Sequence, residues 1–303
     1  MSFVIDKNSI KLRNHWINVI LKLNNFEEAS DLIEKKISQE INEGKIKVLL
    51  DHTRLCSEIP EIYSLNSTQE KIYSKYTDII LSKIFNYLSF KTNILKARGD
   101  SADVDIYFKD INLSFVADAK AFRASRTAKN AKDFKVQSMA KWKKGKPFAL
   151  LVCPTHQLPT NKSQIYSQAI DGDVCIITYS HLAIILNLKK DDNEDQIQNL
   201  FKDIFESIKR LTTTQSANYY WKNINSIILN FSDDVKKVWD KEIELANKSI
   251  RLSKKIALHH YGILIKEMRK LTHKQAIDKL IEPYNNQIKE VKSLENNEIL
   301  KII

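Results

Sequence analysis

The sequence is poor in the residues that break regular structure: its 303 residues include only five glycines and five prolines. This scarcity argues against a loop-rich all-β fold. It also argues against glycine-rich nucleotide-binding loops, and neither G-x-x-x-x-G-K-[ST] nor G-x-G-x-x-G occurs. Cysteine is rare too. Cys56, Cys153 and Cys175 lack the spacing of metal ligands, and the last two lie in apolar runs, where a reduced, buried thiol is expected.

Long apolar runs are also missing. No cationic N-terminal region is followed by a long apolar stretch, so no signal peptide is expected. The longest membrane-like run is HLAIILNL, far short of the ~20 residues that a spanning helix needs. Hydrophobic residues still make up 43% of the chain, which is enough for a folded core. We therefore expect a cytoplasmic, globular protein.

Positive charge is concentrated in one short segment. The formal net charge is +11, and residues 120–146 contain ten Lys or Arg against a single acidic residue, Asp133. Charge that only keeps a protein soluble is scattered over the surface, whereas a cluster of one sign indicates a polyanionic partner such as nucleic acid.

The hydrophobic pattern divides the chain into three regions. Residues 1–66 carry apolar residues at three-to-four spacing, which predicts helices. Residues 67–190 combine a long amphipathic helix, capped by Ser67 or Thr68, with runs of strand character. Residues 191–303 return to helical spacing. The predicted fold class is α/β: a mixed β-sheet core flanked by helices, with helical N- and C-terminal parts.

The core strands show two kinds of pattern. Residues 103–108 and 115–120 alternate between apolar and polar positions, and the short link between them suggests antiparallel neighbours. Residues 148–154 and 173–179 are almost continuously apolar, which is typical of interior strands covered on both faces. The stretch NKSQIYSQAID between these two runs predicts a crossover helix.

The second alternating strand ends in an Asp-x-Lys triplet. Asp118 and Lys120 are two positions apart, so they point to the same side. The preceding strand can bring Asp103 or Asp105 beside Asp118, and alternation does not choose between them. Paired carboxylates repel each other unless a cation lies between them, and oxygen ligands suit Mg²⁺, with the Ala119 carbonyl as a further ligand. Lys120 would position and help deprotonate a water that attacks a phosphate.

Beyond the triplet, a basic residue occupies every third position from Lys120 to Lys135. This spacing drifts by about 60° per step around an α-helix, so these residues cannot share one helical face. We predict an extended or irregular segment at residues 122–131 and a helix that begins near Asp133. A loop of this kind would present its charges along a groove that holds a polyanion.

These motifs resemble those of the PD-(D/E)xK nuclease superfamily and, more narrowly, of the HindIII-like type II restriction endonucleases. The likeness covers about residues 67–190 and is carried by STQEKIYSK, RGDSADVDI, VADAKAFRASRTAKNAKDFK, PTNKSQIY and HLAIIL. The long basic stretch makes the likeness specific. In one departure from the superfamily pattern, Ala102 stands where a proline precedes the first aspartate.

The resemblance implies a Mg²⁺-dependent homodimer that cuts double-stranded DNA at a palindrome, with AAGCTT expected, and that works beside a cognate DNA methyltransferase in a restriction–modification system. It assigns the metal aspartates to Asp103 and Asp118 and the catalytic lysine to Lys120. Glu70 resembles a glutamate that some members add to the outer shell of the metal, and helix capping is the alternative. Residues 191–303 are expected to serve dimerisation and DNA clamping.

The basic segment supplies the expected DNA contacts. The candidate DNA-binding residues are Arg123, Arg126, Lys129, Asn130, Lys132, Asp133 and Lys135. We assign the first three, which are long cations near the active strand, to phosphates. Asn130 and Lys132 are assigned to base edges, because Asn pairs with adenine and Lys donates to guanine acceptors. The alternative is that the whole segment is electrostatic and that helices elsewhere read the bases.

Two other functions remain possible on these residues. A PD-(D/E)xK nuclease of DNA repair or recombination would carry the same site. A non-catalytic DNA-binding protein would keep the fold and the charge. The complete set of Asp103, Asp118 and Lys120 argues against the second possibility, since a protein without catalysis could lose any of the three.

Overall fold

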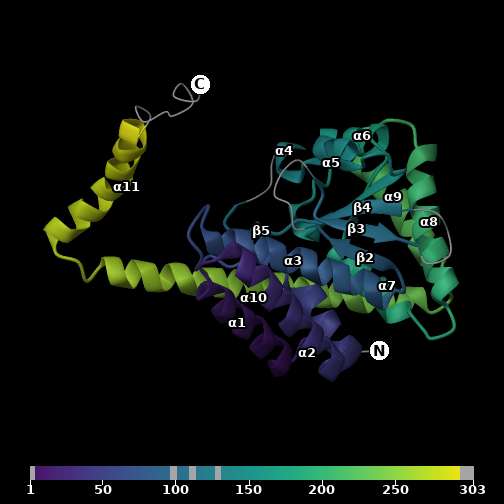
Figure 1. Ribbon diagram of the computed structural model, residues 1–303, viewed down its shortest axis with the longest axis horizontal. Helices are drawn as coiled ribbons and strands as arrows, with labels where there is room; N and C mark the ends of the chain where they lie inside the picture. The colour runs from purple at the N-terminus through teal and green to yellow at the C-terminus, as the bar shows by residue number, and fades with distance from the viewer. Residues whose placement is uncertain (1–3, 96–100, 109–113, 127–130, 294–303) are drawn as a thin grey trace, which may run out of the picture. The chain divides into compact units, whose positions relative to one another are not determined.

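The computed structural model describes residues 4–95, 101–108, 114–126 and 131–293 (Figure 1). The helices are α1 (Lys7–Leu21), α2 (Phe26–Leu55), α3 (Thr68–Tyr87), α4 (Ala131–Phe134), α5 (Val136–Trp142), α6 (Gln164–Asp171), α7 (Tyr179–Leu188), α8 (Glu194–Arg210), α9 (Ala217–Leu229), α10 (Val235–Met268) and α11 (His273–Ser293), with a 3-10 turn η1 at Thr155–Gln157. The strands are β1 (Glu58–Ile59), β2 (Lys91–Ile94), β3 (Val104–Tyr107), β4 (Ser114–Ala119), β5 (Phe122–Arg123), β6 (Phe148–Cys153) and β7 (Val174–Thr178). The predicted α/β class is confirmed.

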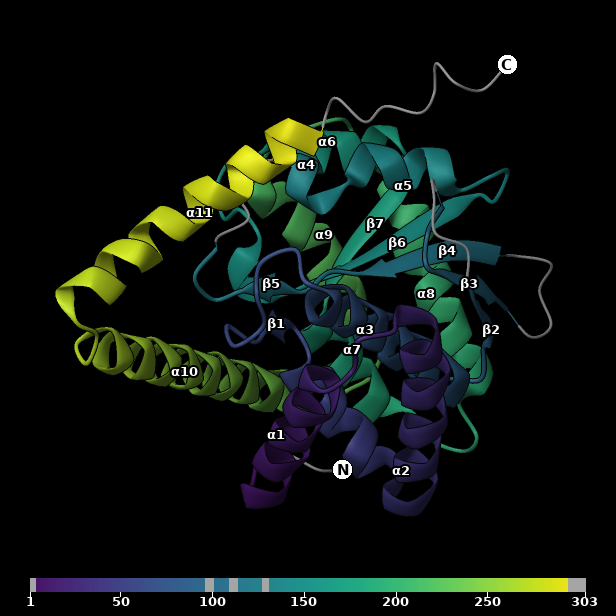
Figure 2. The same cartoon turned by 60° about the vertical axis from the view of Figure 1, so that its left-hand side comes forward.

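A five-stranded mixed sheet with the order β2-β3-β4-β6-β7 forms the core. β3 and β4 are antiparallel neighbours, as predicted, and β4, β6 and β7 are parallel. Helix α3 contacts β2, β3 and β4, whereas α5 and α6 pack against the sheet on the other side, as Figure 2 shows. All residues of β6 and β7 are buried. β7 is the last strand of the sheet, yet α7 and α8 contact it, which explains its apolar composition.

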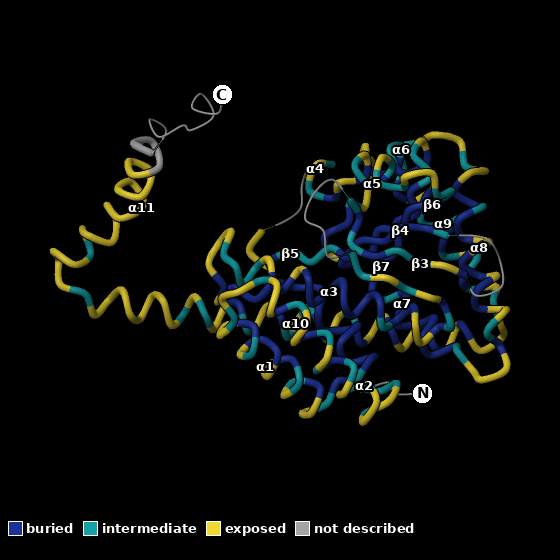
Figure 3. The backbone as a smooth tube through the Cα atoms, viewed as in Figure 1, coloured by how far each residue is buried: buried dark blue, intermediate teal, exposed yellow. Residues whose placement is uncertain are grey.

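Helix α3 starts where its capping residues predict. The Ser67 hydroxyl accepts a hydrogen bond from the Glu70 backbone N–H at 3.2 Å. In Figure 3 the tube of α3 is mostly in the colour of buried residues. The buried face of the helix is mixed, because Lys75, Thr77 and Asp78 are buried together with its apolar residues. Polar groups are seldom buried without a polar partner. These three side chains therefore mark a part of α3 that faces polar groups and not only the apolar core.

Two elements differ from the sequence-based expectation. Alternation does not reveal β2, because its residues KTNI have the polar composition of an edge strand and none of them is fully buried. The helix expected near Asp133 begins at Ala131 and is interrupted at Lys135, whose φ of 54° is left-handed. This interruption allows residues on both sides of it, Phe134 and Val136, to be buried together.

The chain forms two compact units, Met1–Lys255 and Ile256–Ile303. The first unit contains the N-terminal helices and the sheet, and α2 packs closely on α3 and α7 within it. The second unit contains the end of α10 and all of α11. None of the helices that the structure describes is long and apolar enough to cross a membrane.

Cys153 and Cys175 are the buried, reduced thiols that the sequence predicts, and Cys56 has the same environment. Cys56, Cys153 and Cys175 are all free and buried. Burial raises the pKa of each thiol above its ordinary value, because the thiolate would lose its hydration. These thiols are therefore unreactive core residues.

His181, at the start of α7, is neutral in the fold. Its Nδ1 accepts a hydrogen bond from the Thr178 backbone N–H at 3.3 Å, and burial lowers its pKa to about 4 from 6.5. Between these two pH values, the unfolded chain binds a proton that the folded chain does not. The contribution of His181 to stability is therefore complete above pH 6.5 and is lost as the pH falls towards 4.

As the pH falls from 6.5 towards 4, protonation of His181 in the unfolded chain should lower the free energy of unfolding by up to ~1.4 kcal/mol for each pH unit. Urea unfolding of the wild type and of His181→Gln between pH 7 and pH 4.5 checks the expectation. The variant should be less stable at pH 7 and should lose less stability on acidification. Parallel pH dependences for the two proteins would contradict it.

Candidate active site

β4 brings Asp118 and Lys120 to the carboxyl end of the sheet. Asp118 is 3% exposed, and its carboxylate bonds the Lys120 ammonium. The two side chains therefore point the same way, as their spacing predicts. The backbone of Lys120 is held on both sides, since its N–H donates to the Val152 carbonyl at 2.8 Å and its carbonyl accepts from the Tyr179 hydroxyl at 3.1 Å. The lysine thus has a fixed position directly after the strand.

Asp103 lies directly before β3. The adjacent Val104 pairs with Ala117, and continuing this antiparallel register by one residue places Asp103 opposite Asp118. Asp105, the alternative that alternation leaves open, forms an ion pair with Lys146 instead. The structure therefore selects Asp103 as the partner of Asp118.

A third carboxylate comes from helix α3. One carboxylate oxygen from each of Asp78, Asp103 and Asp118 lies within 4.8 Å of the others, and we call these three residues the acidic cluster. Asp78 Oδ1 accepts a hydrogen bond from the Ala119 backbone N–H at 3.4 Å, which joins the helix to the end of β4. The sequence reasoning missed Asp78. Its signal is a carboxylate within the apolar stretch YTDIIL, where a solvated side chain is not expected.

The electrostatics of the acidic cluster favour a bound cation. Burial raises the pKa of Asp103, and the negative charge of Asp118 raises it further. Burial and these two neighbouring carboxylates raise the pKa of Asp78 well above its usual value. Lys75 and Lys120 oppose these shifts without cancelling them. A divalent cation would relieve the repulsion, and a buried donor set made only of oxygen atoms fits a hard ion such as Mg²⁺.

Two other residues were expected near a metal. The Ala119 carbonyl accepts a hydrogen bond from the Thr77 hydroxyl at 3.4 Å, one residue before Asp78 on α3. Glu70 is not part of the acidic cluster. Its carboxylate accepts from Arg123 Nε at 3.1 Å and from the Asn66 backbone N–H at 2.6 Å. In this structure Glu70 therefore stabilises the start of α3 and pairs with a buried arginine.

Arg123 occupies a different environment from the one that its spacing suggests. It is 5% exposed, and its guanidinium lies 3.6 Å from Glu61 and donates to Glu70 and to the Ser64 carbonyl. Its charge is already paired, so Arg123 is not placed to bind phosphate. A basic residue that follows a strand can equally pair with carboxylates that are distant in sequence, and the sequence does not reveal such partners.

The remaining cations of residues 120–146 are partly paired and partly exposed. Lys143 pairs with Asp173, and Lys146 pairs with Asp105. Within the part of the chain that the structure describes, the following are exposed and form no ion pair with a described carboxylate: Arg126, Lys132, Lys135, Lys141 and Lys144. Asp133 is half-buried on α4, and Lys129 and Asn130 lie outside the described residues. These exposed cations are the ones available to a polyanion.

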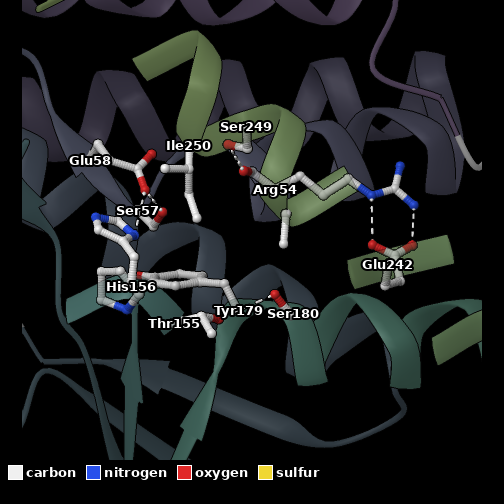
Figure 4. A pocket seen from close by; sticks show the side chains of 12 residues that line it. Arg54, Ser57, Glu58, Thr155, His156, Tyr179, Ser180, Glu242, Ser249 and Ile250 are labelled. Carbon is white, nitrogen blue, oxygen red and sulfur yellow. Dashed lines mark hydrogen bonds and ion pairs between the residues drawn. The ribbon is translucent and has the colours of Figure 1, made fainter. Parts of the chain in front are cut away.

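A pocket near β1, drawn in Figure 4, is separate from the acidic cluster. Its cavity of about 30 Å³ has room for about one water molecule. Arg54 and Glu242 form a buried ion pair at its edge, with Arg54 Nε 3.1 Å from a Glu242 oxygen, and Asn187 donates to the same carboxylate at 2.9 Å. The pocket is too small for a nucleotide, and its lining charges serve packing between α2 and α10.

Comparison with known proteins identifies the family to which this chain belongs. The sequence model of the HindIII restriction endonuclease family matches residues 13–294. The chain belongs to the HindIII restriction endonuclease family. In agreement, the type II restriction enzyme HindIII of Haemophilus influenzae is 30% identical over 281 residues, which cover 88% of this chain and 92% of that enzyme.

Membership of the HindIII family makes this chain a DNA-binding enzyme, a restriction endonuclease. Type II restriction enzymes generally use a divalent metal, and the acidic cluster has the donor chemistry that such an ion requires. The likeness inferred from the motifs of residues 67–190 is confirmed, and the family match extends well beyond them on both sides.

Proposed function

We propose that this HindIII-family chain is a type II site-specific endonuclease that makes Mg²⁺-dependent double-strand breaks at a short palindrome. The observation that carries the proposal is the acidic cluster beside Lys120 at the end of β4. The expected site is AAGCTT, on the resemblance of the motifs. The expected setting is a restriction–modification system in which a cognate methyltransferase protects the same site.

Asp78, Asp103 and Asp118 would hold the metal, with the Ala119 carbonyl as a further oxygen ligand. When bound, Mg²⁺ would polarise the phosphoryl oxygen and lower the pKa of a coordinated water. The chain contributes the placement of the ligands. Because Asp78 lies on α3, Asp103 directly before β3 and Asp118 on β4, packing of the helix on the sheet determines the distances between them.

Lys120 acts as a positioning cation. Burial lowers the pKa of Lys120, but the charge and hydrogen bond of Asp118, together with the charges of Asp103 and Asp78, outweigh burial, so the net shift is upward. Bonded to Asp118 at the edge of the acidic cluster, Lys120 would position the water that attacks the phosphate and help to deprotonate it.

The exposed cations would make two kinds of DNA contact. Arg126 is assigned to phosphate, together with Lys129. Arg126→Ala should weaken binding to every sequence and make the slope of log K against log salt shallower by about 0.9.

Lys132 is assigned to a base edge, together with Asn130, and Lys135 and Asp133 adjoin them. Lys132→Ala should cost roughly 1–3 kcal/mol on the cognate site and much less on scrambled DNA.

Binding isotherms for both variants on cognate and scrambled duplexes at two salt concentrations separate these roles. An equal loss on the two duplexes for Lys132→Ala would remove Lys132 from base reading. An unchanged salt slope for Arg126→Ala would show that Arg126 does not neutralise a phosphate.

The proposal includes a homodimer. A palindrome has two-fold symmetry, and the described residues of each chain hold one acidic cluster, which serves one strand, so two chains would cut the two strands. Exposed apolar side chains on α11 recur at helical spacing and support an association surface in the C-terminal region: Ile277, Leu280, Ile281, Tyr284 and Ile288. Sedimentation of the protein with and without DNA measures the association state.

Digestion of a supercoiled plasmid of known sequence with Mg²⁺, followed by mapping of the ends, tests the proposed function. We expect linear products whose ends all fall within one palindrome. Cuts scattered without sequence preference would instead support a repair nuclease. Absence of cleavage at every Mg²⁺ concentration would overturn the proposal.

A further inference from the structure

One turn of helix α3, which packs against β2, β3 and β4 (Figure 2), carries three buried polar side chains: Lys75, Thr77 and Asp78. Two of them bond to the backbone at the end of β4. The Thr77 hydroxyl donates to the Ala119 carbonyl, and Asp78 accepts from the Ala119 N–H. This turn therefore holds the chain directly after Asp118, which leaves the role of Lys75 to be explained.

Lys75 connects α3 to the backbone of Asp103 through Leu95. Its Nζ donates to the Leu95 carbonyl at 2.9 Å, and the Leu95 N–H donates to the Asp103 carbonyl at 2.9 Å. Leu95 directly follows β2, whose last residue, Ile94, pairs with Val104. The bond between Leu95 and Asp103 thus extends the antiparallel ladder of β2 and β3 by one step. Lys75 holds the residue at the end of that ladder.

The end of this ladder has little else to hold it. β2 is an edge strand in which no residue is fully buried, and strand ends with few packed side chains open easily. Asp103 is half-buried, and its carboxylate is repelled by those of Asp78 and Asp118. This repulsion acts to move Asp103 away from the cluster, so a bond that fixes its backbone opposes the displacement.

The Lys75 ammonium lies close to the acidic cluster as well as to Leu95. Burial raises the pKa of Asp103, the charge of Asp118 raises it further, and the charge of Lys75 opposes both. Lys75 itself is only 7% exposed. A buried ammonium is costly unless polar groups surround it, and the Leu95 carbonyl and the nearby carboxylates provide them. An ammonium has no lone pair, so Lys75 cannot be a metal ligand itself.

We propose that Lys75 is a positioning residue of the metal site, which holds Leu95 and so fixes the backbone of Asp103 beside Asp118. The inference rests on the proposed function, in which Asp103 is a metal ligand. Residues that orient metal ligands typically contribute about 10–100-fold to metal affinity or activity. Through Lys75, Thr77 and Asp78, one turn of α3 then determines the positions of both strand ends that carry the ligands.

Lys75→Met tests the link to Asp103, because methionine has a similar length but no donor and no charge. Hydrogen–deuterium exchange of the Leu95 amide, measured without metal or DNA, reports directly on the bond between Leu95 and Asp103. We expect this amide to exchange roughly tenfold faster, as for the loss of a hydrogen bond to a charged group. Lys75→Arg, which keeps the charge and the donors, should restore most of the protection.

The same variants test the consequence for the site. With saturating Mg²⁺, the single-turnover cleavage rate of Lys75→Met should fall about 10–100-fold, and Lys75→Arg should recover most of it. Leu95→Pro removes the Leu95 N–H and leaves the charge of Lys75 in place, and proline is tolerated at edge strands. Its rate should fall by a similar factor. A purely electrostatic role for Lys75 predicts a wild-type rate for Leu95→Pro.

Lys83→Met is the matched control. Lys83 lies two turns further along α3, and its Nζ donates to Glu34 at 3.3 Å, on the opposite side of the helix pair from the site-bearing strands' ends. The same chemical change there should leave the exchange of the Leu95 amide unchanged and keep the cleavage rate within a few-fold of the wild type.

The outcomes separate this inference from the proposed function. If the wild type cuts within one palindrome, wild-type exchange of Leu95 or full cleavage in Lys75→Met overturns the inference and leaves the function standing. A wild-type rate for Leu95→Pro also overturns it, even if Lys75→Met does not fold. So does an equal loss in Lys83→Met, because the loss would then follow general destabilisation. A wild type that does not cleave with Mg²⁺ overturns the proposed function and the role of Lys75 in it.

Discussion

Replacing Asp118 by asparagine should abolish cleavage while DNA binding is retained. The substitution removes a charged ligand from the acidic cluster and the ion-pair partner of Lys120. We expect the single-turnover rate to fall by roughly 10³-fold or more, since the loss of one preorganised electrostatic group already costs about 10²–10³. Asp103→Asn should have the same effect. Binding in the absence of metal should be unchanged or tighter, because a negative charge that faces phosphate is gone.

Asp105→Asn provides the matched control for this prediction. Asp105 is on β3, two residues from Asp103, but it pairs with Lys146 and is not a member of the acidic cluster. The same change there should keep the cleavage rate within a few-fold of the wild type. Quenched-flow cleavage of a duplex labelled at one end measures all three variants. Full activity in Asp118→Asn or Asp103→Asn would contradict the assignment of these ligands.

Exchange of the metal should separate DNA binding from cleavage completely. Mg²⁺ should support cutting, and excess EDTA should stop it, because the three aspartates alone repel the phosphate. Ca²⁺ also prefers oxygen ligands but is larger and less strictly octahedral, so it should occupy the site and support binding without turnover. Gel-shift and cleavage assays on one duplex with each ion test this. Cleavage that persists in EDTA would contradict a metal mechanism altogether.

The sequence predicts the parts of the site that lie on neighbouring strands. Alternation identifies the side on which Asp118 and Lys120 point, and the antiparallel pairing with β3 follows from the short link. These relations are local, so simple periodicity captures them. The choice of Asp103 over Asp105 depends on the register of the two strands, which periodicity leaves open. The resemblance assigns Asp103, and in the structure Asp103 lies beside Asp118.

The contributions of helix α3 and of Glu61 depend on tertiary packing. Asp78 joins the acidic cluster only because α3 lies on the sheet at this position, and an aspartate on an amphipathic helix usually faces solvent. Glu61 and Glu70 lie far from Arg123 in sequence, so their pairing with it cannot be inferred from spacing. The same limit explains why Arg123, one cation in a regular series, is buried while Arg126 is exposed.

The most direct test of the metal site is to locate the ion. Mn²⁺ prefers the same oxygen ligands as Mg²⁺ and scatters anomalously, so crystals of the protein with its DNA site and Mn²⁺ reveal its position. We predict an anomalous peak within bonding distance of the carboxylates of Asp103 and Asp118, with Asp78 beside it, and no such peak in Asp118→Asn. A peak elsewhere on the chain, or one that survives in Asp118→Asn, would contradict the acidic cluster as the catalytic metal site.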